Sequence, residues 1–452
     1  MKEKTLIAST SGVRGIIGAG LDPLVAIGYA AAFGTMLRKG SVVVGHDSRP
    51  SGDMITRAVI SGMVSTGRDV IDVGIVPTPT VEIAVAELSA SGGICVTASH
   101  NPAQWNALKF FNREGEFITP AQFKKLQAIY NSGRFDFRPF FELGEIETQS
   151  HWIERHVQLI LAAPSLKLPA IKRRRFRVVV DAINGAGSVA LPLLLRKMGV
   201  TVVEINCRGD GDFVHEPEPV PANLGQVSKA VRRHKADLGL ACDPDADRLA
   251  LVDEIGHPIG EELTLAIAVK QVLKNASGPV VINLSTSNVT ADVARLSGSK
   301  VYYSPVGEAN VVHMMRRRQA VIGGEGNGGV IYPAVHTGRD ALVGAALILS
   351  CLAEEKTSLA GLVRTLPKYY IKKTKAVLPE NFSNRLRRFE RETAKLLGAT
   401  RCDRRDGRRF DFRQGWLQIR ASNTEPIFRL IVETVDKDLT DRLCKQIEGY
   451  FT

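Results

Sequence analysis

Three segments of this chain share one order of strand-like, turn-like and helix-like sequence, and this repetition restricts the fold more than any other pattern. Residues 41–74, 176–205 and 278–304 each contain a β-branched run, a polar turn, a helix-like stretch and a second apolar run. Each segment is long enough for one β-α-β unit, in which a helix joins two parallel strands. The repeat predicts an α/β fold with three similar α/β domains that have mixed sheets.

The sequence near the end of the chain has a different composition and hydrophobic pattern. Charged, helix-like sequence at 384–397 precedes a stretch, 406–434, in which apolar and polar residues alternate as they do in paired strands. We expect a smaller C-terminal α+β domain here. The repeat spacing and this change of composition predict four domains, 1–150, 151–255, 256–371 and 372–452.

Length and cysteine usage argue against a membrane or secreted protein. The longest apolar stretch, 341–353, is shorter than the roughly 18–20 residues that cross a bilayer. The first ten residues have too short an apolar run for a secretory signal. Six well-separated cysteines form no CxxC pair, as is typical of reduced thiols. We therefore expect a cytoplasmic protein with no membrane partner.

The net charge of +12 allows more than one interpretation. Basic clusters at 172–177, 314–319 and 385–391 are scattered and are not accompanied by a nucleic-acid-binding motif. Solvated surface is the leading explanation, ahead of attraction of small phosphorylated substrates and of nucleic acid. We expect no nucleic acid partner.

An acidic loop between two strand-like runs carries Asp243, Asp245 and Asp247. Clustered carboxylates repel one another unless a cation joins them, and oxygen donors in a small site suit Mg²⁺. A calcium EF-hand begins with the same spacing but needs a glycine where Arg248 stands, and helices where this chain has strands. A polar hairpin turn without metal is the remaining alternative.

Residues 96–102 place Ser99, His100 and Asn101 together in one predicted turn, which ends at a proline. A serine beside a divalent cation could carry a phosphoryl group, with His100 orienting it. A strand end with a helix cap is the simpler alternative. The glycine-rich segment 323–329 holds one charged residue, Glu325, in a loop that lets a ligand approach the backbone. A plain surface turn would also fit this segment.

Five motifs, at 10–15, 97–102, 243–248, 324–329 and 420–426, resemble in order those of the α-D-phosphohexomutase superfamily. The tracts 100–111 and 324–333 are most similar to the phosphoglucosamine mutase branch of that superfamily. The resemblance implies three similar α/β domains and a smaller fourth domain around a central cleft.

The resemblance also assigns a role to each motif. Ser99 resembles the phosphoserine that gives its group to the sugar, and Mg²⁺ would be held by its phosphate and the three aspartates. Arg14, His100, Lys109 and Arg248 match positions at the reaction centre, where Lys109 is a candidate general acid or base. The substrate-binding positions fall into two groups: Glu325 and Asn327 for sugar hydroxyls, and Arg420, Ser422, Asn423, Thr424 and Arg429 for the non-reacting phosphate.

The implied reaction moves phosphate between the 6- and 1-positions of a hexose phosphate through a hexose 1,6-bisphosphate, in a monomer or homodimer. Glucosamine 6-phosphate is the leading substrate, and phosphomannomutase/phosphoglucomutase activity is the alternative. Many members have Ser-Gly-His where this chain has Asn327, Gly328 and Gly329, so the general acid and base are left open. A non-catalytic sugar-phosphate sensor and a Mg²⁺-dependent phosphatase are the hypotheses from other classes.

Overall fold

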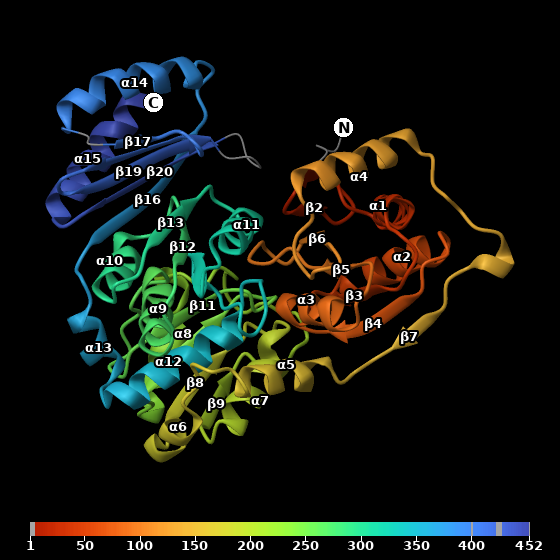
Figure 1. Cartoon of the computed structure of the whole chain (residues 1–452), viewed down its shortest axis with the longest axis horizontal. Coiled ribbons are helices and arrows are strands. Elements are labelled where there is room, and N and C mark those ends of the chain that lie inside the picture. The colour runs from red at the N-terminus through yellow and green to blue at the C-terminus, as the bar shows by residue number, and fades with distance from the viewer. Residues whose placement is uncertain (1–4, 399–400, 422–426, 452) are drawn as a thin grey trace.

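The computed structural model describes residues 5–398, 401–421 and 427–451, which form four domains, each with its own sheet (Figure 1). All three repeated segments contain the predicted unit. In each, two parallel strands flank one helix: β3-α2-β4, β8-α7-β9 and β12-α10-β13. The predicted fold class is confirmed.

Domain 1 is built on a seven-stranded mixed sheet of order β1-β2-β6-β5-β3-β4-β7. Val42 and Val44 of β3 pack into one core and Val43 into another, because successive strand residues face opposite sides of a sheet. The elements are β1 (Ile7–Ser9), β2 (Gly12–Ile16), α1 (Pro23–Met36), β3 (Val42–His46), α2 (Gly52–Val64), β4 (Val70–Ile75), α3 (Thr78–Glu87), β5 (Gly92–Val96), β6 (Trp105–Phe111), α4 (Pro120–Ser132), η1 (Phe140–Glu142) and β7 (Ile146–Thr148).

Domain 2 has a four-stranded sheet of order β11-β10-β8-β9. Strands β10 and β11 form an antiparallel hairpin whose turn is the predicted acidic loop. The elements are α5 (Trp152–Leu161), α6 (Leu168–Arg174), β8 (Arg177–Asp181), α7 (Gly187–Lys197), β9 (Thr201–Ile205), η2 (Pro221–Asn223), α8 (Gly225–His234), β10 (Leu238–Cys242) and β11 (Leu249–Val252).

Domain 3 has a sheet of order β13-β12-β14-β15. Its elements are α9 (Glu262–Asn275), β12 (Val280–Asn283), α10 (Asn288–Leu296), β13 (Val301–Ser304), α11 (Glu308–Arg318), β14 (Ile322–Glu325), β15 (Gly329–Ile331), α12 (Ala341–Glu355) and α13 (Leu359–Thr365).

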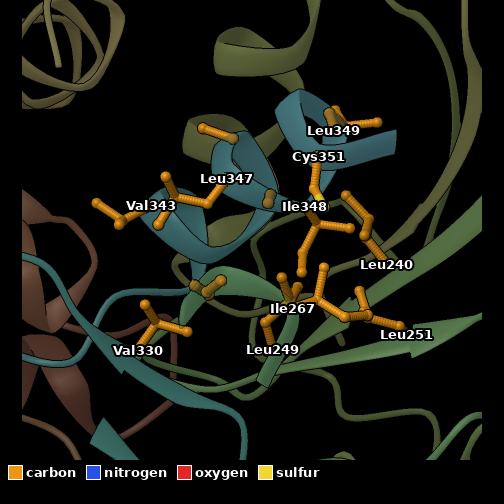
Figure 2. Packing of buried hydrophobic residues seen from close by; sticks show 14 of the residues in the cluster. Leu240, Leu249, Leu251, Ile267, Val330, Val343, Leu347, Ile348, Leu349 and Cys351 are labelled. Atoms are coloured by element: carbon orange, nitrogen blue, oxygen red, sulfur yellow. The ribbon is translucent and has the colours of Figure 1, made fainter. Parts of the chain in front are cut away.

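One apolar core spans domains 2 and 3. In Figure 2, Ile348 of α12 and Ile267 of α9 lie beside Leu240 and Leu251 of domain 2, and all four are fully buried. The longest apolar stretch of the sequence is thus the interior of α12, which is buried over nearly its whole length. Among the described residues, no helix is long and apolar enough to span a membrane.

Domain 4 is an antiparallel sheet of order β16-β20-β19-β18-β17, packed with two helices around Phe410, Phe428 and Phe451. In Figure 1 it lies against domain 3, on the side away from domain 1. Its elements are β16 (Tyr370–Val377), α14 (Phe382–Leu396), β17 (Arg401–Asp403), β18 (Arg408–Phe412), β19 (Gly415–Ala421), β20 (Ile427–Thr434) and α15 (Lys437–Phe451).

Candidate active site

The Ser99 turn joins β5 to β6 where domain 1 meets domain 2. Ser99 has φ = 49°, and its backbone N–H donates to Thr97 Oγ1 at 3.0 Å. Its hydroxyl donates to Asp243 Oδ2 at 2.7 Å. The left-handed conformation costs about 1–2 kcal/mol for a residue other than glycine, and such strain concentrates at functional sites. The fold therefore brings the predicted serine into contact with the predicted metal loop.

Arg49, in the turn after β3, holds the Ser99 turn by its backbone. The guanidinium is 2% exposed, and its Nε pairs with Asp47 Oδ2 at 3.0 Å. Its two terminal nitrogens donate to four backbone carbonyls, those of Ser99, Asn101, Pro102 and Trp105. All five N–H groups of this arginine thus have acceptors. The local sequence around Arg49 does not show which carbonyls it will contact, so this role could not be predicted from the sequence.

The β10–β11 hairpin turns Asp243, Asp245 and Asp247 toward one point, with oxygen atoms within 4.8 Å of one another. All three residues are at most 1% exposed. Asp245 Oδ1 and Asp247 Oδ1 are buried without a hydrogen-bond partner among the described residues. Burial, and then the neighbouring carboxylates, raise the pKa of Asp243 well above its usual value. Converging buried carboxylates with unused oxygens fit a hard divalent cation such as Mg²⁺.

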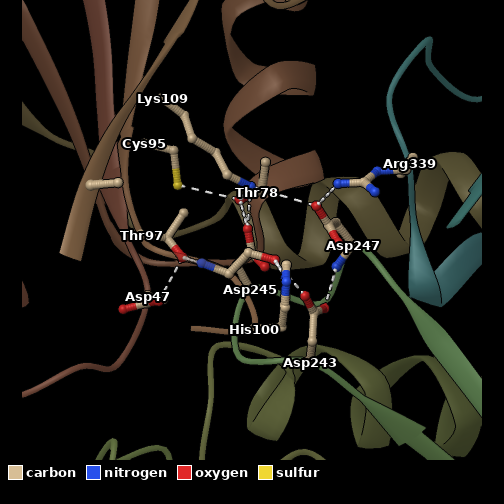
Figure 3. Close-up of polar contacts among 12 residues, drawn as sticks. Asp47, Thr78, Cys95, Thr97, His100, Lys109, Asp243, Asp245, Asp247 and Arg339 are labelled. Carbon is tan, nitrogen blue, oxygen red and sulfur yellow. Dashed lines mark hydrogen bonds and ion pairs between the residues drawn. The ribbon is translucent and has the colours of Figure 1, made fainter. Parts of the chain in front are cut away.

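Lys109 of β6 and Thr78 of α3 reach the same carboxylate from domain 1 (Figure 3). Lys109 Nζ and Thr78 Oγ1 each donate to Asp245 Oδ2 at 2.5 Å, and Lys109 also lies 3.5 Å from Asp247 Oδ2. Burial works against the charge of Lys109, but the carboxylates of Asp245 and Asp247 raise its pKa above the ordinary value. A charged lysine therefore stands beside the acidic loop.

His100 and two arginines surround the serine. His100 Nδ1 lies 3.3 Å from Ser99 Oγ, and Arg14 Nη1 donates to Asn101 Oδ1 at 3.3 Å in the same turn. Arg248, which follows the acidic loop, is 9% exposed. Burial, and then the charges of Arg248 and Arg14, hold the pKa of His100 well below its usual range. His100 thus lies beside the Ser99 hydroxyl, Arg14 contacts the same turn, and the charge of Arg248 acts on His100.

Glu325 ends β14 and is 4% exposed. Its carboxylate accepts from Asn283 Nδ2 at 2.7 Å, from the Gly307 N–H at 2.9 Å and from Arg339 Nη1 at 2.9 Å. Burial opposes ionisation, but Arg339 and then the Gly307 N–H lower the pKa of Glu325. Asn327 follows in the loop and accepts from the Gly329 N–H at 3.2 Å. A sugar-reading role for Glu325 and Asn327 stays a prediction.

The glycine-rich loop packs directly onto the β10–β11 hairpin. The Leu249 N–H donates to the Gly328 carbonyl at 3.1 Å. Gly328 has φ = 87°, and a Cβ there would lie 2.3 Å from the Leu249 carbonyl oxygen. Only glycine fits this approach, so the loop composition reflects the junction between domains 2 and 3.

The predicted phosphate clamp is described only in part. Arg420 of β19 lies directly opposite Arg429 of β20. Burial, and then the like charge of Arg429, lower the pKa of Arg420. The carboxylates of Asp406 and Glu325 act in the opposite direction and raise the pKa of Arg420. The remaining predicted clamp residues lie outside the described residues: Ser422, Asn423 and Thr424.

Four domain models match the chain in order. They are phosphoglucomutase/phosphomannomutase α/β/α domain I at 5–137, domain II at 154–256, domain III at 261–370 and the C-terminal domain at 375–449.

Named relatives and a solved structure agree with this match. The chain is 38% identical to a phosphoglucomutase/phosphomannomutase of Thermococcus kodakarensis over 95% of this chain and 94% of the relative. It is 35% identical, at the same coverage, to a probable phosphoglucosamine mutase of Methanopyrus kandleri. A crystal structure of a Burkholderia thailandensis phosphoglucomutase/phosphomannomutase family protein superposes with a TM-score of 0.85 at 28% identity, covering 98% and 97% of the two chains. This chain therefore belongs to the phosphoglucomutase/phosphomannomutase family of phosphohexomutases, which are intramolecular phosphotransferases.

Proposed function

We propose that this protein interconverts hexose 6-phosphates and hexose 1-phosphates through a phosphoryl group carried on Ser99. The observation that carries the proposal is the 2.7 Å contact between Ser99 Oγ and Asp243 Oδ2, at the point where three buried carboxylates converge. A serine held in a left-handed turn beside a metal-ligand set suits a phosphoryl carrier.

The transfer moves one phosphoryl group at a time. The bond from phosphorus to Ser99 Oγ breaks as a bond to the free sugar hydroxyl forms, which gives a hexose 1,6-bisphosphate. The bisphosphate turns end for end, and its other phosphate returns to Ser99. Free hexose 1,6-bisphosphate would restore the phosphorylated enzyme as an activator.

The residues around Ser99 supply positive charge and proton exchange. Arg14, Arg248 and Lys109 surround the site of a dianionic group, where cationic donors stabilise the charge of transfer. His100 and Lys109 are our candidates for exchanging the proton of the sugar hydroxyl. Mg²⁺, held by Asp243, Asp245 and Asp247, would neutralise charge on the phosphoryl group.

The other end of the substrate would meet domains 3 and 4. Glu325 and Asn327 would bind sugar hydroxyls, and Arg420 with Arg429 and residues 422–424 would bind the phosphate that does not react.

Glucosamine 6-phosphate is our proposed substrate, and mannose and glucose phosphates are the alternative. Relatives of similar identity carry both kinds of name, so the choice depends on assay. An amino group and a hydroxyl have nearly the same size, so hydrogen bonding or charge must discriminate, by about 1–3 kcal/mol. Some activity on glucose phosphates is therefore expected.

The decisive experiment measures kcat/KM for glucosamine, glucose and mannose 6-phosphates, each with its own 1,6-bisphosphate present. We expect glucosamine 6-phosphate to lead. A lead of about tenfold or more for mannose or glucose would overturn the glucosamine assignment but leave the mutase proposal standing.

The variant Ser99→Ala tests the carrier itself. The change removes one hydroxyl and little packing, so we expect a folded protein without mutase activity. Intact-mass analysis should show one added phosphoryl group on the parent after incubation with bisphosphate, and none on the variant. Phosphate release exceeding isomer formation would favour the phosphatase alternative, and binding without turnover by the parent would favour a sensor.

A further inference from the structure

One arginine outside every sequence motif joins the predicted metal loop to the predicted sugar loop. Arg339 Nη2 donates to Asp247 Oδ2 at 2.5 Å, and Nη1 donates to Glu325 Oε2 at 2.9 Å. Its Nε and backbone N–H both donate to Glu308, at 3.0 and 2.9 Å. The residue is 8% exposed, and Figure 3 shows it facing Asp247 from domain 3.

The junction between domains 2 and 3 has contacts besides those of Arg339. The two domains share one apolar core, and backbone bonds link Leu249 to Gly328 at 3.1 Å and Ala341 to Ala246 at 3.0 Å. A buried ion pair adds little net stability compared with apolar packing of this extent. What Arg339 adds to these contacts is a direct bridge between the carboxylates of Asp247 and Glu325.

The arginine fork is suited to this bridge. A guanidinium is planar and has five N–H donors in fixed directions, whereas lysine offers one point charge. Glu308 anchors Nε and the backbone, so the rigid fork directs one terminal nitrogen at Asp247 and the other at Glu325. Among the described residues, each terminal nitrogen uses one of its two N–H groups on these carboxylates.

The glycine-rich loop is shaped around this side chain. A Cβ at Gly329 would lie 2.4 Å from Arg339 Cδ. A larger residue at 329 would displace the arginine. The absence of a side chain at 329 and the presence of Arg339 are thus two parts of one arrangement.

We propose that Arg339 is a positioning residue of the mutase reaction. It sets the direction of Asp247 as a metal ligand and of Glu325 as a sugar-binding group, and fixes the two relative to each other. The inference rests on the proposed function, because it assigns Asp247 and Glu325 the roles given there.

The test uses Arg339→Lys, which keeps the charge and removes the fork. Since the charge is constant, a change in divalent-cation affinity reports orientation. Losing an outer partner of a metal ligand typically costs about 10–100-fold in affinity or activity. We expect Mn²⁺ binding to the substrate-free protein, measured calorimetrically, to weaken about tenfold, and kcat to fall about 100-fold.

The matched control is Arg155→Lys. Arg155 lies on α5 and also joins two domains, through two hydrogen bonds to Glu87 at 2.8 and 2.6 Å, but 42% of its side chain is exposed. We expect its kcat and Mn²⁺ affinity to stay within twofold of the parent. Thermal unfolding of both variants checks that each protein is folded.

An Arg339→Lys protein whose Mn²⁺ affinity and kcat both match the parent would overturn the proposal, because charge alone would then suffice. If the parent turned over no hexose phosphate, the proposed function would fail. The Mn²⁺ titration would still decide whether Arg339 orients Asp247.

Discussion

Replacing Arg49 with lysine should damage catalysis far more than an equally buried substitution elsewhere in domain 1. Arg49 donates to four carbonyls of the Ser99 turn and to Asp47. Lysine has three donors, so at least two of these five bonds are lost. Each buried acceptor left without a donor costs about 1–3 kcal/mol, which predicts a loss of roughly 2–6 kcal/mol in the unfolding free energy.

The same loss frees the turn that holds Ser99 at positive φ. A displacement of a reacting group by about 1 Å can cost 100-fold in rate. We therefore expect kcat, measured per folded molecule with saturating 1,6-bisphosphate, to fall about 100-fold, with KM little changed because Arg49 does not face the sugar-binding loops.

Arg68→Lys provides the control. Arg68 is 7% exposed and donates to the carbonyls of Gly34 and Leu37, at 2.9 and 3.0 Å, near the end of α1 and away from Ser99. Its lysine variant should also lower the unfolding midpoint, but should keep kcat within twofold of the parent. If Arg49→Lys lost stability and kept the parent kcat, the positioning argument for Arg49 would be refuted.

Three further outcomes are expected. Asp245→Asn removes one charge from the triad and should weaken Mn²⁺ binding by about tenfold or more; coincident titrations of variant and parent would refute the metal assignment. Arg420→Ala should raise KM for both monophosphates by about 10- to 150-fold, the worth of a charge-assisted bond, with little change in unfolding midpoint; an unchanged KM would place the phosphate elsewhere. Burial opposes the charge of His336, but hydrogen bonds to Asp340 and Glu82 raise its pKa to about 9. Because this folded-state pKa exceeds the unfolded value of about 6.5, the stabilisation is complete below pH 6.5 and lost as pH rises through 9. Burial raises the pKa of the neighbouring Glu82 to about 8, so that carboxyl titrates in the same range. Thermal unfolding across this range should therefore show a larger loss in the parent than in His336→Gln.

The sequence predicted the elements whose signals are local. The β-α-β order in 41–74, 176–205 and 278–304 follows from hydrophobic periodicity and turn residues within about 30 positions, and all three units are present. The clustering of Asp243, Asp245 and Asp247 was predictable for the same reason, because all three residues lie in one short turn.

Contacts between segments that are distant in the sequence could not be predicted from local sequence patterns. Nothing in residues 96–102 shows that Ser99 will meet Asp243 from another domain, and only the order of known motifs indicated that these segments act together. Domain boundaries near 150, 255 and 371 stay predictions, because no sharp change of composition marks the first two.

Only the tertiary structure shows which arginine side chains contact the candidate active site. Arg49 and Arg339 are two of many arginines in a basic chain, and each has a local sequence that would suit a solvated surface. Because both guanidinium groups are buried away from water, their N–H groups must donate hydrogen bonds to acceptors within the protein. Those acceptors come from distant segments: carbonyls of 99–105 for Arg49, and Asp247, Glu308 and Glu325 for Arg339. The sequence by itself predicted which groups carry the chemistry, and the packing of domains determined which charged side chains contact them, because buried polar groups take their partners from wherever the fold brings them.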